Sequence, residues 1–376
     1  MTTLNVVVDD MLSAVPGGAS TYATEMTSAL IDFAPAGCFV EGLVASSTQE
    51  QYDFIASRLP GLAGLFKSAL VRRDLTRAWQ HGFTPVPSGM VHAPTLYAPL
   101  RRHDRVNDRS SQIAVTIHDT VAWTHPEFLT SREVAWTKSM AARAVRYADA
   151  VVVPTHAVAS ELDELLGLGD RTRVIAGAVA ESLAVPDDAE ERAERLELPD
   201  RYLVSVGDSG PRQGIKDLLS ALSILDDDLP LMIVGAEREP GSLQSAITES
   251  GVDSGRVRGL GALDSADYAT VLAGATVFVH PTVANGFGTP MLEAFKLGVP
   301  VIHAATPSLL EVAGDAGVPI STSDPDAYAG LIAESIARLL GDADLRKTMA
   351  ILGEDRSRVF SWAAAAEAIW QLHAGL

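Results

Sequence analysis

Residues 277–302 constrain the fold most, because a strand, a glycine-rich loop, a helix and a second strand follow one another there. A short apolar run ends at His280, the loop at 285–290 leads into an amphipathic run, and Gly298 closes that run. This order predicts a βαβ unit with two parallel strands. The same alternation of strand and helix continues through both halves of the chain.

The loop in this stretch has the features of a ligand site. Gly286 and Gly288 allow main-chain amides to approach a ligand closely, and the loop delivers them to a helix N-terminus. Pro290 suits the first helical turn, and we expect Glu293 in the same turn. Phosphate or sugar oxygens would suit the amides, and ribose hydroxyls the carboxylate. A tight turn without a ligand is the simpler alternative, but Pro290 and Glu293 together favour a site.

The composition indicates a two-domain protein that does not bind nucleic acid. The chain has 376 residues, which exceeds one ordinary domain, and its 48 acidic and 29 basic residues give a formal charge of −19. Such a charge opposes a basic nucleic-acid-binding face. The single cysteine, Cys38, fits a reducing compartment, and neither a signal-peptide pattern nor a membrane-spanning run is found. We therefore expect a cytoplasmic protein.

Three further positions follow predicted strands, at the strand ends where ligands bind in open α/β sheets. Gly17–Gly18 precede a helical run, His118 follows the apolar run 113–117, and Arg212 lies in the loop after the strand 202–207. From the residues alone, a simple turn, a buried structural histidine and a solvated arginine remain open alternatives.

Residues 58–82 concentrate positive charge in this acidic chain. The segment carries five basic residues and one acid, interleaved with apolar residues. We interpret it as a basic helix with an apolar face, which can lie on an anionic membrane surface; an ordinary solvated helix and loop is the alternative. An acceptor carrying phosphate or a lipid head group would suit this cluster.

The stretch 285–301 resembles the signature of the retaining glycosyltransferases called glycosyl transferases group 1, or family 4, which have the GT-B fold. The matching residues are Gly286, Phe287, Gly288, Pro290, Glu293, Ala294, Gly298, Pro300 and Val301. Thr289 occupies the variable position of the loop, and Asn285 stands where the family has a first glutamate. In the glycine-containing loop after the strand 202–207, Arg212 matches the family's arginine and Gln213 replaces its lysine.

The resemblance implies an α/β protein with the GT-B fold, in which two Rossmann-like, doubly wound parallel-sheet domains face each other across a cleft. Residues 1–180 would form the acceptor-side domain and 181–200 a linker with a short charged helix. Residues 201–358 would bind the nucleotide sugar, and 359–376 would form a helix crossing back to the first domain.

The function implied is that of a hexosyltransferase. It would move a sugar from a nucleoside-diphosphate sugar, such as GDP-mannose or a UDP-sugar, to a hydroxyl of a glycan, lipid or small-molecule acceptor. The anomeric configuration would be retained. We expect no metal or other cofactor, and a location in the cytoplasm or at the inner face of the membrane.

The resemblance also assigns roles to residues. Arg212 would neutralise the leaving diphosphate, His118 would position the transferred sugar, and Glu293 would bind the nucleotide ribose. The donor-binding set is Gly17, Gly18, Arg212, Gln213, Asn285, Gly286, Phe287, Gly288, Thr289 and Glu293. Because Gln213 and Asn285 depart from the family pattern, a catalytically weak or inactive nucleotide-sugar-binding protein is the alternative. A purely structural α/β protein would require all three glycine loops to be accidental.

Overall fold

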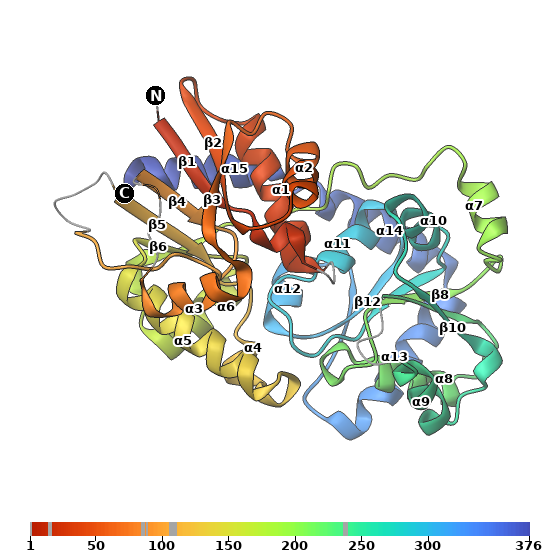
Figure 1. The fold of residues 1–376 in the computed structure, drawn as a ribbon. Coiled ribbons are helices and arrows are strands. Elements are labelled where there is room, and N and C mark those ends of the chain that lie inside the picture. The colour runs from red at the N-terminus through yellow and green to blue at the C-terminus, as the bar shows by residue number, and fades with distance from the viewer. Residues whose placement is uncertain (1, 14–16, 84–86, 88, 105–110, 236–239) are drawn as a thin grey trace. The chain divides into compact units, whose positions relative to one another are not determined.

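The chain forms two compact α/β units, shown in Figure 1. The computed structural model describes residues 2–13, 17–83, 87, 89–104, 111–235 and 240–376. Unit 1 consists of residues 1–177 and 361–376, and unit 2 consists of residues 178–360. The C-terminal helix α15 (Trp362–Gly375) therefore belongs to unit 1, although unit 2 precedes it in the chain.

Unit 1 alternates strands with helices. Its strands are β1 (Thr2–Val7), β2 (Cys38–Ser46), β3 (Gly64–Val71), β4 (Gly89–Ala93), β5 (Ser111–Thr116), β6 (Ala150–Val153) and β7 (Thr172–Val174). Its helices, besides α15, are α1 (Gly18–Asp32), α2 (Gln49–Arg58), α3 (Arg72–His81), α4 (Val121–Thr124), α5 (Ser131–Tyr147) and α6 (His156–Leu166), with short 3-10 turns η1 (Asp9–Leu12), η2 (Pro126–Phe128) and η3 (Gly169–Arg171).

Unit 2 follows the same plan. Its strands are β8 (Leu203–Val206), β9 (Leu231–Val234), β10 (Val257–Gly261), β11 (Val277–His280), β12 (Val301–Ala304) and β13 (Val318–Ile320). Its helices are α7 (Ala189–Arg195), α8 (Ile215–Ile224), α9 (Ser242–Ser250), α10 (Ser265–Ala273), α11 (Thr289–Lys296), α12 (Pro307–Ala313), α13 (Pro325–Gly341) and α14 (Ala343–Ser357), with 3-10 turns η4 (Pro211–Gln213) and η5 (Ser254–Arg256).

Each unit is built on one parallel sheet, which confirms the predicted pair of Rossmann-like domains. In the part of the chain that is described, the strand orders are β3-β2-β1-β4-β5-β6-β7 and β10-β9-β8-β11-β12-β13. The order reverses between β1 and β4 in unit 1, and between β8 and β11 in unit 2. Loops at the carboxyl ends of the two strands diverge at such a point and leave a crevice where ligands bind.

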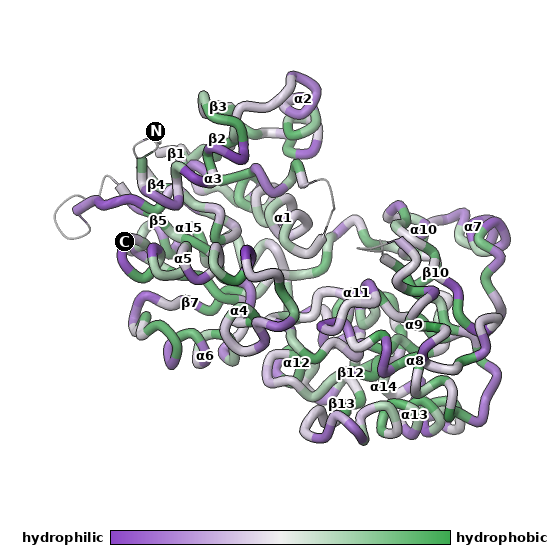
Figure 2. Tube along the Cα trace, turned by 60° about the horizontal axis from the view of Figure 1, so that its bottom comes forward, coloured by the Kyte–Doolittle hydropathy of each residue, from purple (hydrophilic) through white to green (hydrophobic). Residues whose placement is uncertain are grey.

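Burial on both faces explains why the strands read as continuous apolar runs. Val277, Phe278 and Val279 of β11 are each 0% exposed, and β12 is buried throughout. Polar residues instead gather on peripheral elements such as α7, which is almost entirely hydrophilic in Figure 2. This helix lies in the segment expected to be a linker, and Arg192 donates a hydrogen bond of 2.7 Å to Asp267 of α10, so the segment packs on unit 2.

The interpretation of residues 58–82 as one basic amphipathic helix is wrong. Residues 64–71 form the edge strand β3, which pairs with β2, and the helix begins only at Arg72. The helix α3 is amphipathic, but its apolar residues Leu75 and Trp79 are 0% and 2% exposed. They are buried in the core of unit 1, so this apolar face is not available to a membrane. No described helix is long and apolar enough to cross a bilayer.

A buried histidine pair lies beneath the C-terminal helix of unit 1. His92 of β4 and His373 of α15 are 0% and 2% exposed, and their ring centroids are 5.9 Å apart. Neither ring nitrogen of His92 has a hydrogen-bond partner among the residues described. Burial lowers the pKa of His92 to about 3 and that of His373 to about 4, so both rings are neutral in the folded protein at pH 7.

We expect His92→Leu to reduce the loss of stability in mild acid. His92 titrates near 6.5 when unfolded and near 3 when folded, so the unfolded chain binds the extra proton and stability falls as pH drops below 6.5. The contribution of one such histidine at pH 5, relative to pH 7, is about 2 kcal/mol. Urea unfolding of wild type and variant across pH 5–7 measures the difference; equal pH slopes would contradict this role.

Candidate functional site

Asn285 organises the glycine loop that follows β11. Its side-chain oxygen accepts a hydrogen bond of 2.7 Å from the Phe287 amide, and its amide nitrogen lies 3.3 Å from Nε2 of His280. Burial lowers the pKa of His280 to about 3, so this ring is neutral and its Nε2 can accept from Asn285. Ser308 donates to the Asn285 carbonyl at 2.5 Å. Asn285 thus shapes the loop through both polar atoms of its side chain.

Gly288 turns this loop into α11. Its φ of +85° is in the left-handed region, and a Cβ there would lie 2.4 Å from Cδ2 of Leu309, so only glycine fits without rearrangement. The helix begins at Thr289, with Pro290 in its first turn as predicted. Its N-terminus therefore directs the positive end of a helix dipole towards the loop.

Glu293 lies one turn further into the helix than predicted, as the fifth residue of α11. Its Oε2 accepts a hydrogen bond of 2.6 Å from the hydroxyl of Tyr268, which comes from α10. Burial raises the pKa of Glu293, and the Tyr268 bond and Lys296 oppose that rise. The sequence pattern contains no signal for Tyr268, because its contact with Glu293 joins residues 25 positions apart on two different helices.

The loop after β8 is joined directly to the loop after β11. Nε of Arg212 donates to the Ala284 carbonyl at 2.7 Å, and the Arg212 carbonyl accepts from the Val283 amide at 3.1 Å. Oε1 of Gln213 accepts from the Thr282 hydroxyl at 3.2 Å. The structure therefore brings Arg212, Gln213 and the 285–288 loop together at the β8–β11 switch point.

Gly214 allows the two loops to approach this closely. It is the N-cap residue of α8 with φ +68°, and a Cβ there would lie 2.1 Å from the Pro281 carbonyl oxygen. Lys216, considered as a substitute for the missing lysine, forms an exposed ion pair with Glu249 at 2.9 Å. Its ammonium group is therefore engaged with α9.

A small pocket lies at the carboxyl ends of β8, β9 and β10. Its volume is about 230 Å³, and four glycines contribute to its wall, Gly207, Gly235, Gly259 and Gly261. A Cβ on Gly235 would lie 2.7 Å from the Gly207 carbonyl oxygen, so the two loops meet backbone to backbone. The pocket can take one planar ring system against bare main chain.

Unit 1 holds the remaining predicted residues. Nε2 of His118 lies 2.8 Å from the Pro94 carbonyl oxygen, and the ring makes an edge contact with Tyr22 at 4.6 Å. Burial lowers the pKa of His118, so the ring is neutral and carries its hydrogen on Nε2, as the carbonyl partner requires. Nδ1 is then a hydrogen-bond acceptor.

Gly17 and Gly18 form the start of α1. The amide of Gly17 donates to the Ser20 hydroxyl at 3.0 Å. Neither glycine has a positive φ, and no described atom lies within 4 Å of a Cβ placed on either of them. Packing among the described residues therefore does not explain why glycine occurs at both positions.

The described residues contain no group of three or more His, Cys, Asp or Glu side chains that could hold a metal ion.

Comparison with known proteins places this geometry in a family. The family model described as Glycosyl transferases group 1 matches residues 187–355, and the one described as Glycosyltransferase Family 4 matches residues 16–182. The chain belongs to the group 1 glycosyltransferases with the GT-B fold, and it is a glycosyltransferase.

Individual proteins agree with this assignment. The O-antigen chain mannosyltransferase B of Escherichia coli is 28% identical over 287 residues, which cover 73% of this chain and 71% of that protein. Two solved structures share the fold: sucrose-phosphate synthase of Thermosynechococcus elongatus has a TM-score of 0.76 at 19% identity and covers 100% of this chain and 99% of its own. HepE of Anabaena, in complex with UDP and glucose, has a TM-score of 0.75 at 18% identity and covers 100% of both chains.

We expect Gly214→Ala to destabilise unit 2 far more than Gly251→Ala. Both glycines have similar left-handed φ values, +68° and +72°, but no atom of the described residues lies within 4 Å of a Cβ on Gly251. The control should cost about 1–2 kcal/mol from backbone strain alone. Gly214→Ala adds a steric overlap and should cost about 3 kcal/mol or more. Urea unfolding measures both, and equal losses would show that the Pro281 contact is unimportant.

Proposed function

We propose that the protein transfers a hexose from a nucleoside-diphosphate sugar to an acceptor hydroxyl with retention of configuration, and that unit 2 binds the donor. The observation that carries this proposal is the joining of two glycine loops at the β8–β11 switch point by Arg212. Each loop leads into a helix, α8 or α11, so main-chain amides, two helix dipoles and a guanidinium group are available to one diphosphate.

The reaction explains why this concentration of donors is useful. When the bond from the anomeric carbon to the diphosphate breaks, negative charge develops on the leaving oxygen and positive charge on the sugar. Fixed hydrogen-bond donors at the leaving group lower the barrier, each by about 3 kcal/mol for a well-placed one. We assign this role to Arg212 and to the amides of Gly286 and Gly288.

The nucleoside is assigned to the neighbouring features of unit 2. The glycine-walled pocket of about 230 Å³ is suited to the base, because a planar ring can pack on backbone that carries no side chain. The Tyr268 hydroxyl donates a hydrogen bond to Oε2 of Glu293. Oε1 is left to accept from ribose hydroxyls.

Unit 1 supplies groups for the sugar and the acceptor. With its hydrogen directed to Pro94, neutral His118 offers Nδ1 to a sugar hydroxyl as a positioning acceptor. Gly17 and Gly18 lie at the start of α1, where main-chain amides suit an anionic group of the ligand. The Gly17 amide already donates to the Ser20 hydroxyl, so we assign this role to the amide of Gly18. No metal or other cofactor enters this proposal, and the single cysteine supports a cytoplasmic location.

The names of similar proteins guide the choice of donors for testing. One relative is a mannosyltransferase and one structural neighbour was solved with UDP and glucose, so GDP-mannose and UDP-glucose are the first candidates. The acceptor is a hydroxyl of a glycan, lipid or small molecule. A retaining double displacement on an enzyme carboxylate is not proposed, because Asn285 stands at the family's glutamate position and is engaged in the loop.

That engagement of Asn285 also favours a second candidate function, a nucleotide-sugar-binding protein of weak or absent activity. A thermal-shift screen with UDP, GDP, ADP and TDP, followed by turnover assays with the matching sugars, separates the two. Under both candidates one nucleotide raises the melting temperature, with a stabilisation of about 2.7 kcal/mol at a hundredfold excess over Kd. Transfer or hydrolysis of a sugar supports the enzyme; binding without either supports the alternative; no binding contradicts both.

We expect Arg212→Ala to weaken binding of the nucleoside diphosphate by about 10–100-fold, since a charge-assisted hydrogen bond is worth about 1.5–3 kcal/mol. Binding of the matching nucleoside, which lacks phosphates, should change little. Calorimetric titration measures both ligands, with Arg358→Ala as a surface control because Arg358 pairs only with exposed acids of α14 in the described structure. An equal loss for nucleoside and diphosphate would show that Arg212 acts only by holding the loop.

We expect Gly18→Ala to keep or raise the melting temperature, since alanine favours the first turn of a helix and has open space at this position. If the α1 amides contact the donor, the added methyl group should nevertheless lower kcat/KM about tenfold or more. Steady-state kinetics and thermal unfolding of the same preparation test this. Unchanged kinetics would remove Gly18 from the donor site.

A further inference from the structure

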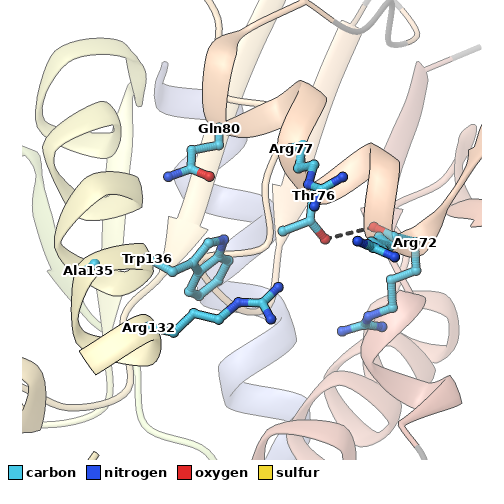
Figure 3. A pocket seen from close by; sticks show the side chains of 8 residues that line it. Arg72, Thr76, Arg77, Gln80, Arg132, Ala135 and Trp136 are labelled. Atoms are coloured by element: carbon cyan, nitrogen blue, oxygen red, sulfur yellow. Dashed lines mark hydrogen bonds between the residues drawn. The ribbon is translucent and has the colours of Figure 1, made fainter. Parts of the chain in front are cut away.

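A basic hollow lies between α3 and α5 in unit 1, and Figure 3 shows its lining. Its volume is about 970 Å³, and its charged and aromatic wall consists of Arg72, Arg73, Arg77, Arg132 and Trp136. These arginines gather in a chain whose formal charge is −19, so the local charge opposes the charge of the whole protein. An anion is the natural occupant of such a hollow.

Only two of the four guanidinium groups have a carboxylate partner in the described structure. Arg72 pairs with Asp10 at 2.5 Å, and Arg77 approaches Asp74 at 3.8 Å. Arg73 and Arg132 are exposed, and no described acidic group forms an ion pair with either. The hollow therefore keeps two uncompensated positive charges.

The positions of these arginines within their helices add to the electrostatic repulsion that their positive charges experience. Arg72 and Arg73 are the first two residues of α3, and Arg132 is the second residue of α5. A helix N-terminus carries partial positive charge and favours acidic residues. Placing arginines at two neighbouring helix starts opposes that preference, and a bound anion would relieve the repulsion.

Trp136 gives the hollow a second kind of surface. Figure 3 shows its indole and the guanidinium of Arg132 both pointing from α5 towards α3. The indole Nε1 is buried and has no hydrogen-bond partner among the described residues. An aromatic face beside a cluster of arginines can hold the body of a ligand whose charged group is bound by the guanidinium groups.

Hydrogen bonds connect this hollow to the strand ends where His118 lies. Asp10, the partner of Arg72, accepts a hydrogen bond of 2.6 Å from the Thr95 hydroxyl. The preceding residue, Pro94, accepts from His118 at 2.8 Å through its carbonyl oxygen. The hollow and His118 are therefore linked at the same edge of the unit 1 sheet.

We propose that this hollow binds a phosphate group carried by the acceptor, as a phosphomonoester or a phosphodiester. This inference rests on the proposed function, in which unit 1 presents an acceptor hydroxyl. Guanidinium groups bind phosphate oxygens in pairs, and two helix N-termini add to the attraction. A volume of about 970 Å³ greatly exceeds an inorganic phosphate, so the phosphate is attached to a larger body that packs on Trp136.

The test uses the full-length protein with its donor site saturated by the nucleotide found in the thermal-shift screen. Calorimetric titration compares glucose 6-phosphate and glycerol 3-phosphate with unphosphorylated glucose and glycerol. Sedimentation with phosphatidylcholine vesicles, with or without phosphatidylglycerol, tests a phosphate supplied by a lipid surface. Binding of a phosphorylated small molecule identifies a soluble source, and binding only to the anionic vesicles identifies a lipid source.

Charge-reversal variants of the two arginines without an ion-pair partner test whether the phosphate binds in this hollow. Arg73→Glu and Arg132→Glu place an acid in a first helical turn, which suits the helix dipole, so both variants should keep the wild-type melting temperature. Each should weaken phosphate binding by about tenfold or more. Arg58→Glu makes the same charge change at the exposed end of α2, outside the hollow, and should weaken binding less than about twofold.

The inference is overturned if neither the phosphorylated probes nor the anionic vesicles bind. It is also overturned if Arg58→Glu weakens binding as much as Arg132→Glu, because the effect would then come from overall charge. All three variants should retain the nucleotide-induced thermal shift. If no nucleotide raises the melting temperature of the wild-type protein, the proposed function is contradicted. If a nucleotide does so but no phosphate-bearing probe binds, only this inference is contradicted.

Discussion

The close contact between the loops after β8 and β11 determines the geometry of unit 2's carboxyl edge. It requires a residue without a Cβ at position 214, where the Pro281 carbonyl oxygen occupies the space of a side chain. Hydrogen bonds from Arg212 to Ala284 and from Thr282 to Gln213 then fix the two loops together. Two helix starts are thereby held at one switch point, a geometry that neither loop could provide alone.

Burial determines where positive charge is placed at these edges. The pKa values of His118, His280 and His303 are all lowered, chiefly by burial, so none contributes an imidazolium ion at neutral pH. His280 instead accepts a hydrogen bond from Asn285 and supports the loop. The positive charge proposed for the donor site of unit 2 therefore comes from Arg212 and from main-chain amides, and that of the hollow in unit 1 comes from the arginines of α3 and α5.

Much of this could be predicted from the sequence because local patterns determine it. The apolar run 277–279, the glycines of the 285–288 loop and Pro290 specify a strand, a turn and a helix start without reference to the rest of the chain. Contacts between distant segments could not be predicted in this way. The hydrogen bond from Tyr268 to Glu293 joins residues that are 25 positions apart, and Arg132 joins Arg73 only because α5 packs beside α3. Residues 64–71 form a strand and not the expected helix, because an apolar segment with a basic residue can serve as an edge strand as well as a helix.

Under the proposed function, the joined loops of unit 2 bind the diphosphate of an activated sugar. A crystal structure with the best-binding nucleoside diphosphate tests it most directly. In that structure the diphosphate should lie on the amides of Gly286 and Gly288 and on the Arg212 guanidinium, and a ribose hydroxyl should contact Glu293. A nucleotide bound elsewhere, or one whose phosphates lie away from Arg212 and the 285–288 loop, would contradict it.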